Sequence, residues 1–274
     1  MGLIVHDIAD PYFSAIAHGA QRGLAASGMQ LMVASTERRR NAEARAVQTF
    51  MSYRTNAILI AGTRGFDDDE QLYSMLKRYQ ANGGRPVMIG QPPAQVDGVR
   101  IADRRSAGRL ARELLRMGYK RFITIAGEEH VVTSRERAEG FKDQLLRSGI
   151  EPEAQLRGAF TRDGGYLMMA EYLRSTSNAL PTGDRGKLCV FCTTDVMTLG
   201  ALAAARDAGL TVPDDIALCG YGDIQSLNDH APSITTVRIP LEEIGELSVE
   251  IALGDPGRHI LIEGTPMLRE STAT

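Results

Sequence analysis

The chain has 274 residues, of which 43% are hydrophobic, and 31 Lys and Arg against 34 Asp and Glu give a formal net charge of −3. This length and apolar content suit one large domain or two of medium size. The charge excludes the strongly basic surface typical of nucleic-acid-binding domains, so the basic run at residues 38–40 is interpreted as a solvated helix start. No apolar run approaches the roughly 20 residues that span a bilayer.

The chain opens with GLIVHD, which predicts a strand rather than a signal peptide, because a basic segment and a cleavage site are lacking. We therefore expect a cytoplasmic protein, and a natural sequence that extends upstream. From here short apolar runs alternate with helical patterns such as YFSAIAHGAQRGLAASG and SAGRLARELLRMGYK. The apolar runs are, in chain order, GLIVHD, QLMVAS, NAILIAG, RPVMIG, VRIAD, RFITIAG, KLCVFCT, DIALCGY and ITTVRI.

This alternation predicts an α/β protein with parallel sheets covered by helices on both faces. About five strands precede ADRRSAG and about four follow it, which favours two doubly wound lobes over one large sheet. The first boundary is expected near residues 102–104. A helix from Leu241 to about Leu253 and the run HILIEG could return to complete the first lobe.

Ligands of open parallel sheets bind beyond the carboxyl ends of the strands, so the loops there are candidate sites. After the first strand come His6, Asp7, Asp10, Tyr12 and Phe13. Asp10 can cap the next helix, with Pro11 at its first position. The same polar groups and rings are typical of a sugar site. Both roles are compatible.

The segment TSRERAEGF predicts Arg137 at a strand-to-helix junction, where a cation is disfavoured by the helix dipole. The arginine could therefore face a ligand carboxylate, phosphate or hydroxyl pair. The alternative is a surface arginine paired with Glu128, Glu129 or Glu136. In the next lobe, Thr193 or Thr194 can cap a helix whose first turn contains Asp195.

Other motifs argue against catalysis and cofactors. GYGDIQ lacks the third glycine of a dinucleotide fingerprint, and no Walker lysine motif or metal-ligand spacing of histidines occurs. Cys189 and Cys192 lie in a strand-like run, which directs their thiols to opposite faces and favours buried structural cysteines. We expect no enzyme, no metal and no cofactor.

Several segments together resemble the LacI/GalR family of transcriptional regulators over nearly the whole chain. They are GLIVHDIADPYFSAIAHGAQRGLAASG, NAILIAG, ADRRSAGRLARELLRMGYKRFITIAG, SRERAEGF, TTDVMTLGALAAARDAGLTVPDDIALCGYGDI and APSITTVRIPLEEIGELSVEIAL. The resemblance implies a periplasmic-binding-protein-like fold of two lobes joined by three crossings. The predicted lobes comprise residues 1–103 with 238–265, and residues 104–237 with 266–274.

The resemblance also implies a homodimer, an effector in a cleft between the lobes, and operator binding by a helix-turn-helix headpiece. This sequence has no such headpiece, so we expect the chain alone not to bind an operator. Effector binding would be coupled to the headpiece through two lobe arrangements of different affinity. A periplasmic sugar-binding protein of an uptake system is the alternative, although a signal peptide is lacking.

The resemblance assigns ligand contacts to Tyr12 and Phe13, to Arg137 of the R-x-x-G-[FW] motif, and to Phe160 as a stacking ring. Other positions depart from the family pattern. Thr194 precedes Asp195 where the family has Asn-Asp, and Gly90 and Gly222 replace frequent acids. Because these groups often contact neutral sugars, their loss beside a retained arginine favours an anionic effector such as a sugar acid.

Overall fold

The computed structural model describes residues 1–39, 41–62, 69–176 and 186–273. The chain divides into two compact units, residues 1–101 with 240–262 and residues 102–239 with 263–274. It therefore passes between the units three times. Arg40 of the basic run lies outside the described residues.

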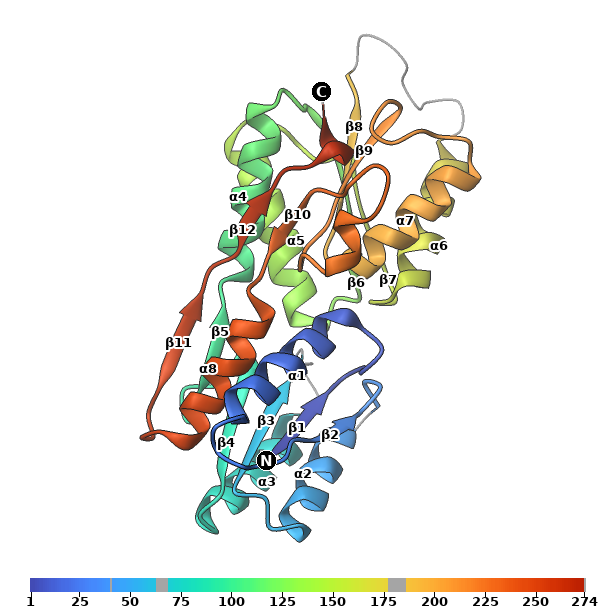
Figure 1. Ribbon diagram of the computed structural model, residues 1–274. Helices are drawn as coiled ribbons and strands as arrows, with labels where there is room; N and C mark the ends of the chain where they lie inside the picture. The colour runs from blue at the N-terminus through green and yellow to red at the C-terminus, as the bar shows by residue number, and fades with distance from the viewer. Residues whose placement is uncertain (40, 63–68, 177–185, 274) are drawn as a thin grey trace. The chain divides into compact units, whose positions relative to one another are not determined.

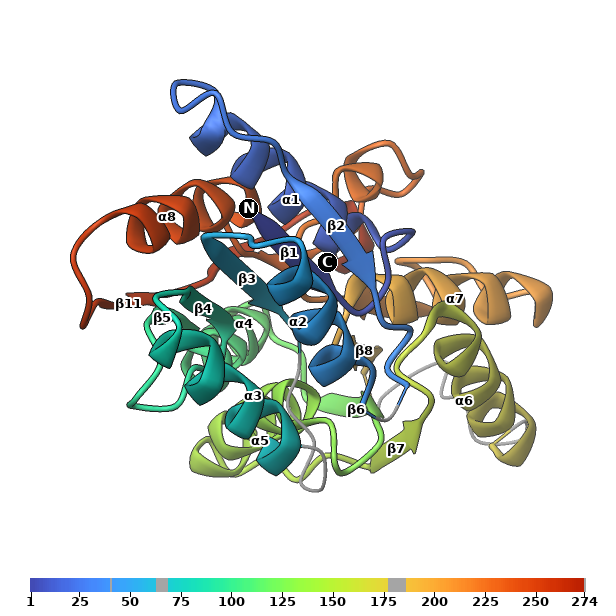
Figure 2. The same ribbon diagram turned by 90° about the horizontal axis from the view of Figure 1, so that it is seen from below.

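The first unit contains a six-stranded parallel sheet, in the order β11-β5-β4-β3-β1-β2. Helices α1 and α8 pack together on one face, and α2 and α3 cover the other (Figure 2). The elements are β1 (Gly2–Val5), α1 (Pro11–Leu24), β2 (Met32–Ser35), α2 (Ala42–Ser52), β3 (Ala57–Ala61), α3 (Asp69–Ala81), β4 (Arg85–Gly90), β5 (Gly98–Ile101), α8 (Leu241–Leu253) and β11 (His259–Ile262).

The second unit has a four-stranded parallel sheet, in the order β7-β6-β8-β9, and an antiparallel pair of β10 and β12. Helices α4 and α5 pack together, as do α6 and α7 on the other side of the sheet (Figure 1). The elements are α4 (Asp103–Arg116), β6 (Arg121–Gly127), α5 (Val132–Arg147), β7 (Ala154–Gly158), α6 (Arg162–Ser175), β8 (Leu188–Cys192), α7 (Asp195–Asp207), β9 (Ile216–Cys219), a 3-10 helix (Gln225–Asn228), β10 (Thr236–Arg238), β12 (Thr265–Met267) and a 3-10 helix (Glu270–Thr272).

Strand position explains the sequence patterns. Inner strands are buried on both faces, which is why they consist mainly of continuous apolar residues. This holds for β1, β3 and β8, and for β6 after its first residue. The edge strands β2 and β11 alternate between half-buried and exposed residues. The predicted fold class, two parallel-sheet lobes of α/β type, is confirmed.

The three cysteines are free and fully buried, as the sequence predicts. Cys192 belongs to the core cluster that contains Met169 and Met197, and burial raises the pKa of its thiol to about 12. Cys189 lies beside Cys219 from the neighbouring strand. Such fully buried thiols are packing residues rather than nucleophiles.

Candidate effector site

In the first unit, several predicted site residues meet at the carboxyl ends of β1, β3 and β4. His6 follows β1 and is 6% exposed, and its ring contacts Phe13 edge-on with centroids 5.9 Å apart. A Cβ on Gly62, which follows β3, would lie 2.4 Å from His6 Nε2, so the imidazole fills the space that a side chain would need. A Cβ on Gly90, the last residue of β4, would lie 3.6 Å from the Gly62 carbonyl oxygen. His6, Phe13 and Gly90 are thus gathered at one sheet edge.

The acids of the same loop hold the backbone. Asp10 is the N-cap of α1 and accepts a hydrogen bond from the Tyr12 backbone N–H at 3.0 Å, with Pro11 at the first helical position, as predicted. Asp7 is exposed and accepts from the Ala9 N–H at 2.9 Å. The Tyr12 ring packs edge-on against Phe13, with centroids 5.3 Å apart. These contacts fix the direction in which α1 leaves the sheet.

In the second unit, Arg137 is at the centre of a buried polar network. Its helix begins at Val132, so Arg137 lies in the second turn and not at the junction that the sequence suggests. The guanidinium is 4% exposed, and Nε donates to Asp103 Oδ1 at 2.7 Å while Nη1 donates to the Thr193 carbonyl oxygen at 3.0 Å. Its Cζ lies 4.0 Å from the centroid of the Tyr221 ring. The ion pair with Asp103 replaces the surface pairing with a neighbouring glutamate that the sequence left open.

Thr193 connects the polar network around Arg137 to the carboxyl ends of β6 and β8. It follows β8, and its hydroxyl shares a hydrogen bond with Ser134 Oγ at 2.8 Å. Ser134 Oγ in turn accepts from the backbone N–H of Gly127, the last residue of β6, at 2.7 Å. Ser134 and Thr193 are fully buried, and the hydrogen bonds of their hydroxyl groups connect α5 to the carboxyl ends of β6 and β8.

Two polar atoms of this edge have no hydrogen-bond partner among the described residues. They are Asp103 Oδ2 and Thr133 Oγ1, which belong to side chains 3% and 5% exposed. A buried polar atom without a partner loses its interaction with water, which costs about 1–3 kcal/mol and more for a charge. Such atoms are therefore suited to a ligand that supplies the missing donor or acceptor.

Asp195, in the first turn of α7, is fully buried. Its carboxylate accepts from Thr236 Oγ1 at 2.6 Å and from the Ile224 backbone N–H at 3.0 Å, and so joins α7 to β10 and to the loop after β9. Burial is the main cause that raises the pKa of Asp195 to about 6, and the two hydrogen bonds oppose it. Thr194 takes the N-cap position, but its side chain makes no cap hydrogen bond.

The loop after β9 contains Gly222, whose backbone is bonded on both sides. Its N–H donates to the Val237 carbonyl at 2.9 Å and its carbonyl accepts from the Ile239 N–H at 3.3 Å. The φ of Gly222 is +135°, a conformation that residues with a side chain rarely adopt. Gly90 has a φ of +109°. The two glycines at positions where the family often has acids are therefore required by the backbone.

Asp223 follows Gly222 and is clamped by two arginines. Its Oδ2 accepts from Arg238 Nε and its Oδ1 from Arg269 Nη2, both at 2.6 Å, and the side chain is 4% exposed.

Phe160 follows β7 and is half-buried over Gly127, where a Cβ would lie 2.7 Å from Phe160 Cδ2. Phe160 thereby places the loop after β7 against the carboxyl end of β6.

Sequence reasoning had not assigned a site role to Asp103, Thr133, Ser134 or Thr193. The sequence does contain a signal for Asp103. This acid begins a helix just after the strand VRI, at the carboxyl end of that strand, where ligand-binding residues are expected. In the part of the chain that the structure describes, no cluster of His, Cys, Asp and Glu could hold a metal ion. Nor is any helix there long and apolar enough to cross a membrane.

Comparison with known proteins shows the family to which the chain belongs. Residues 111–272 match the family model of the periplasmic binding protein-like domain. The chain is 30% identical over 258 residues to the HTH-type transcriptional repressor PurR of Haemophilus influenzae (strain PittEE), covering 92% of this chain and 72% of that repressor. It is 29% identical over 263 residues to the repressor CytR of Escherichia coli K12, covering 94% and 73% respectively.

The chain belongs to the LacI family of transcriptional regulators. The family is one of DNA-binding regulators rather than enzymes, and its members act in the cytoplasm. Among solved structures, a complex of the transcriptional regulator CelR with cellobiose aligns with a TM-score of 0.83 and 26% identity, covering 98% of this chain and 83% of that one. A dimeric Lac repressor aligns with a TM-score of 0.84 and 20% identity, covering 99% and 98%, and shows the shared fold.

Proposed function

We propose that this chain is the effector-binding and dimerisation core of a LacI-type regulator, and that its effector is a small, hydroxyl-rich, sugar-like molecule. Binding would be coupled to operator DNA through a helix-turn-helix headpiece. The observation that carries the proposal is the buried pair of Arg137 and Asp103, which leaves Asp103 Oδ2 without a partner among the described residues. A ligand hydroxyl can donate to that oxygen.

The predicted residues at the carboxyl end of each sheet are further candidate contacts for the effector. Sugar binding needs hydroxyl partners and apolar ring faces, and each edge by itself offers both kinds of group. The residues concerned are His6, Asp7, Asp10, Tyr12, Phe13 and Gly90 in the first unit, and Arg137, Phe160, Thr194, Asp195 and Gly222 in the second. That CelR was solved with cellobiose supports a sugar-like effector for a related chain.

The charge of the effector depends on the partners of Arg137. The sequence favours a sugar acid, since acids are replaced by glycine at two positions. Geometry favours a neutral ligand, because the positive charge of Arg137 is already balanced by Asp103 and a ligand carboxylate would be repelled by Asp103 Oδ2. We therefore propose a neutral polyol or sugar as the main ligand class.

Calorimetry with a panel of neutral mono- and disaccharides and the corresponding sugar acids tests this proposal. We expect saturable binding of a neutral member, weakened at least about tenfold by Asp103→Asn, because the amide replaces a charged acceptor with a weaker one. Arg162→Gln, on the exposed surface of α6, is the control and should bind as the parent does. Tighter binding of a sugar acid would contradict the neutral ligand, and no binding by any member would contradict the sugar-like class.

A further inference from the structure

A groove on the second unit lies between α4 and α5. The helices approach closely through glycines: a Cβ on Gly140 would lie 2.0 Å from the Arg104 carbonyl oxygen, and one on Gly108 would lie 3.1 Å from the Gly140 carbonyl oxygen. Beside this contact is a groove of about 490 Å³. That volume lies in the range of small-molecule sites and exceeds what a single inorganic ion fills.

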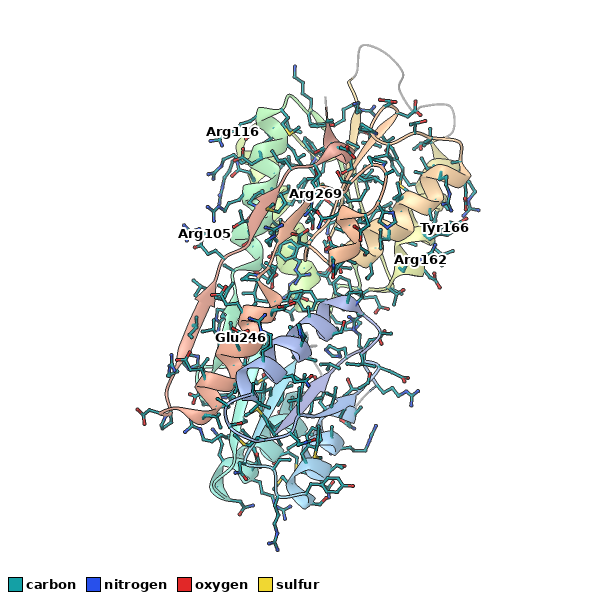
Figure 3. The ribbon with its side chains drawn as sticks, in the orientation of Figure 1. Arg105, Arg116, Arg162, Tyr166, Glu246 and Arg269 are labelled. Atoms are coloured by element: carbon teal, nitrogen blue, oxygen red, sulfur yellow. The ribbon has the colours of Figure 1, made fainter. Side chains whose placement is uncertain are left out.

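The lining of the groove is strongly basic, although the chain as a whole is slightly acidic. Five arginines and one acid, Asp143, contribute charge. Arg105, labelled in Figure 3, projects outward from α4, as does Arg116 at the end of the same helix. The lining residues are Arg104, Arg105, Gly108, Arg109, Arg112, Gly140, Asp143, Gln144 and Arg147.

Carboxylates neutralise only part of this charge. Arg104 pairs with three acids, with Asp143 at 2.7 Å, with Glu136 at 3.7 Å and with Glu139. Arg105 and Arg109 share a single acid, Glu263, at 2.5 and 3.0 Å.

The remaining two arginines have no acid partner within the described part of the chain. Arg112 donates to the neutral amide of Gln144 at 3.4 Å, and Arg147 makes no ion pair with a described residue. Both side chains belong to exposed residues. The groove therefore holds more guanidinium groups than the neighbouring carboxylates balance.

The helix dipole favours some of these arginines and disfavours others, depending on their position along the helix. Arg147 ends α5, where a positive charge interacts favourably with the helix dipole. Arg105 lies in the first turn of α4, where the dipole disfavours a cation. Arg105 is thus held beside the groove by its ion pair with Glu263 rather than by an advantage to its own helix.

We propose that this groove binds a small, multiply charged anion that bears phosphate groups. Guanidinium groups present rigid forks of N–H donors that match phosphate oxygens two at a time. Several arginines around one hollow favour an anion with more than one charge. The groove is bounded by two helices, which suits a compact ligand better than the extended backbone of a nucleic acid duplex.

The probe is inorganic tripolyphosphate, titrated by calorimetry into the 274-residue chain at a constant ionic strength of ~0.15 M, where exposed charges are screened beyond about 8 Å. We expect one saturable site per chain. The double variant Arg109→Gln/Arg112→Gln should weaken binding at least about tenfold. The matched control, Arg162→Gln/Arg206→Gln, removes two exposed arginines from α6 and α7 and should stay within about twofold of the parent.

Equal losses in the two double variants would overturn the proposal, because the binding would then reflect overall charge. Absence of saturable binding would overturn it as well, as would a short DNA duplex that competes more strongly than tripolyphosphate. The single variant Arg112→Gln provides a second measurement if the double variant does not fold, and circular dichroism monitors folding of each protein. An intermediate loss of affinity in the single variant supports the proposal, and an unchanged affinity contradicts it.

Discussion

Gly222 shows at the scale of one residue how backbone and ligand explanations compete. From the sequence alone, the missing acid at position 222 indicates an unusual effector. In the structure, a φ of +135° and hydrogen bonds from both backbone groups give a reason for glycine that involves no ligand. The absence of an acid at this position is therefore weak evidence about effector charge.

Substitutions at Gly222 separate the two explanations. Gly222→Asp and Gly222→Ala should each lower the free energy of unfolding by about 1–3 kcal/mol, because either side chain is strained at this φ. Urea denaturation measures the loss. A stable Gly222→Asp variant that also binds neutral sugars more tightly than the parent would restore the ligand explanation.

Asp195 makes stability depend on pH. Its pKa is raised from 3.8 to about 6 by burial in the folded chain, so the folded state takes up a proton that the unfolded chain has released. The stability associated with this group is fully present below pH 4, falls as pH rises toward about 6, and then levels off. The whole change corresponds to roughly 3 kcal/mol.

Comparison with Asp195→Asn isolates this effect. The substitution should lower the free energy of unfolding at every pH, because an amide has only one oxygen where the carboxylate has two acceptors. If that oxygen accepts from Thr236, the NH2 group faces the Ile224 N–H, and two donors then oppose each other. The parent should lose roughly 3 kcal/mol relative to the variant between pH 4 and pH 7. Chemical denaturation at these two pH values gives the difference, and parallel pH profiles for the two proteins would contradict a titrating Asp195.

At the scale of elements, the contact of α4 and α5 depends on Gly140. Its Cβ would lie 2.0 Å from the Arg104 carbonyl oxygen, and backbone cannot move aside as a flexible side chain can. Gly140→Ala should therefore destabilise the chain by about 1–3 kcal/mol through overpacking, in spite of the better helix propensity of alanine.

Gly108 on the facing helix offers the matched control for this prediction. Its Cβ would lie 3.1 Å from the Gly140 carbonyl oxygen, which is also backbone but needs to move by only a few tenths of an ångström, far less than the overlap at Gly140 requires. Gly108→Ala should be nearly neutral, because the gain of about 1 kcal/mol in helix propensity offsets the strain. Thermal or chemical unfolding of both variants measures the difference, and a larger loss at Gly108 would show that the helices approach elsewhere.

The elements themselves were predictable where burial follows position in the sheet. The apolar runs identify the inner strands, and Leu241–Leu253 matches α8 at both ends. Strand β7 (Ala154–Gly158) was not predicted, because it is an edge strand whose residues AQLRG are all half-buried and include an arginine. The short β12 pairs with β10 across 27 or more residues, and local sequence carries no sign of such pairing.

The candidate site was predictable only in part. Strand ends located the loops that lie at the carboxyl edges of the two sheets, and the cap at Asp10 follows from local spacing. The partners of Arg137 lie 34 and 56 residues away in sequence, and the partner of Ser134 lies 59 residues away. Such pairs depend on which helix packs beside which strand, so periodicity cannot give them.

At the scale of the whole molecule, the order of segments has a consequence for genetics. Neither unit is a continuous stretch of chain, because residues 240–262 return to the first and residues 263–274 to the second. A premature stop codon after residue 239 would remove α8 and the edge strand β11, and with α8 one of the two helices that cover one face of the first sheet. Nonsense mutations as late as residue 239 should thus abolish the folded first unit, although they leave its first 101 residues intact.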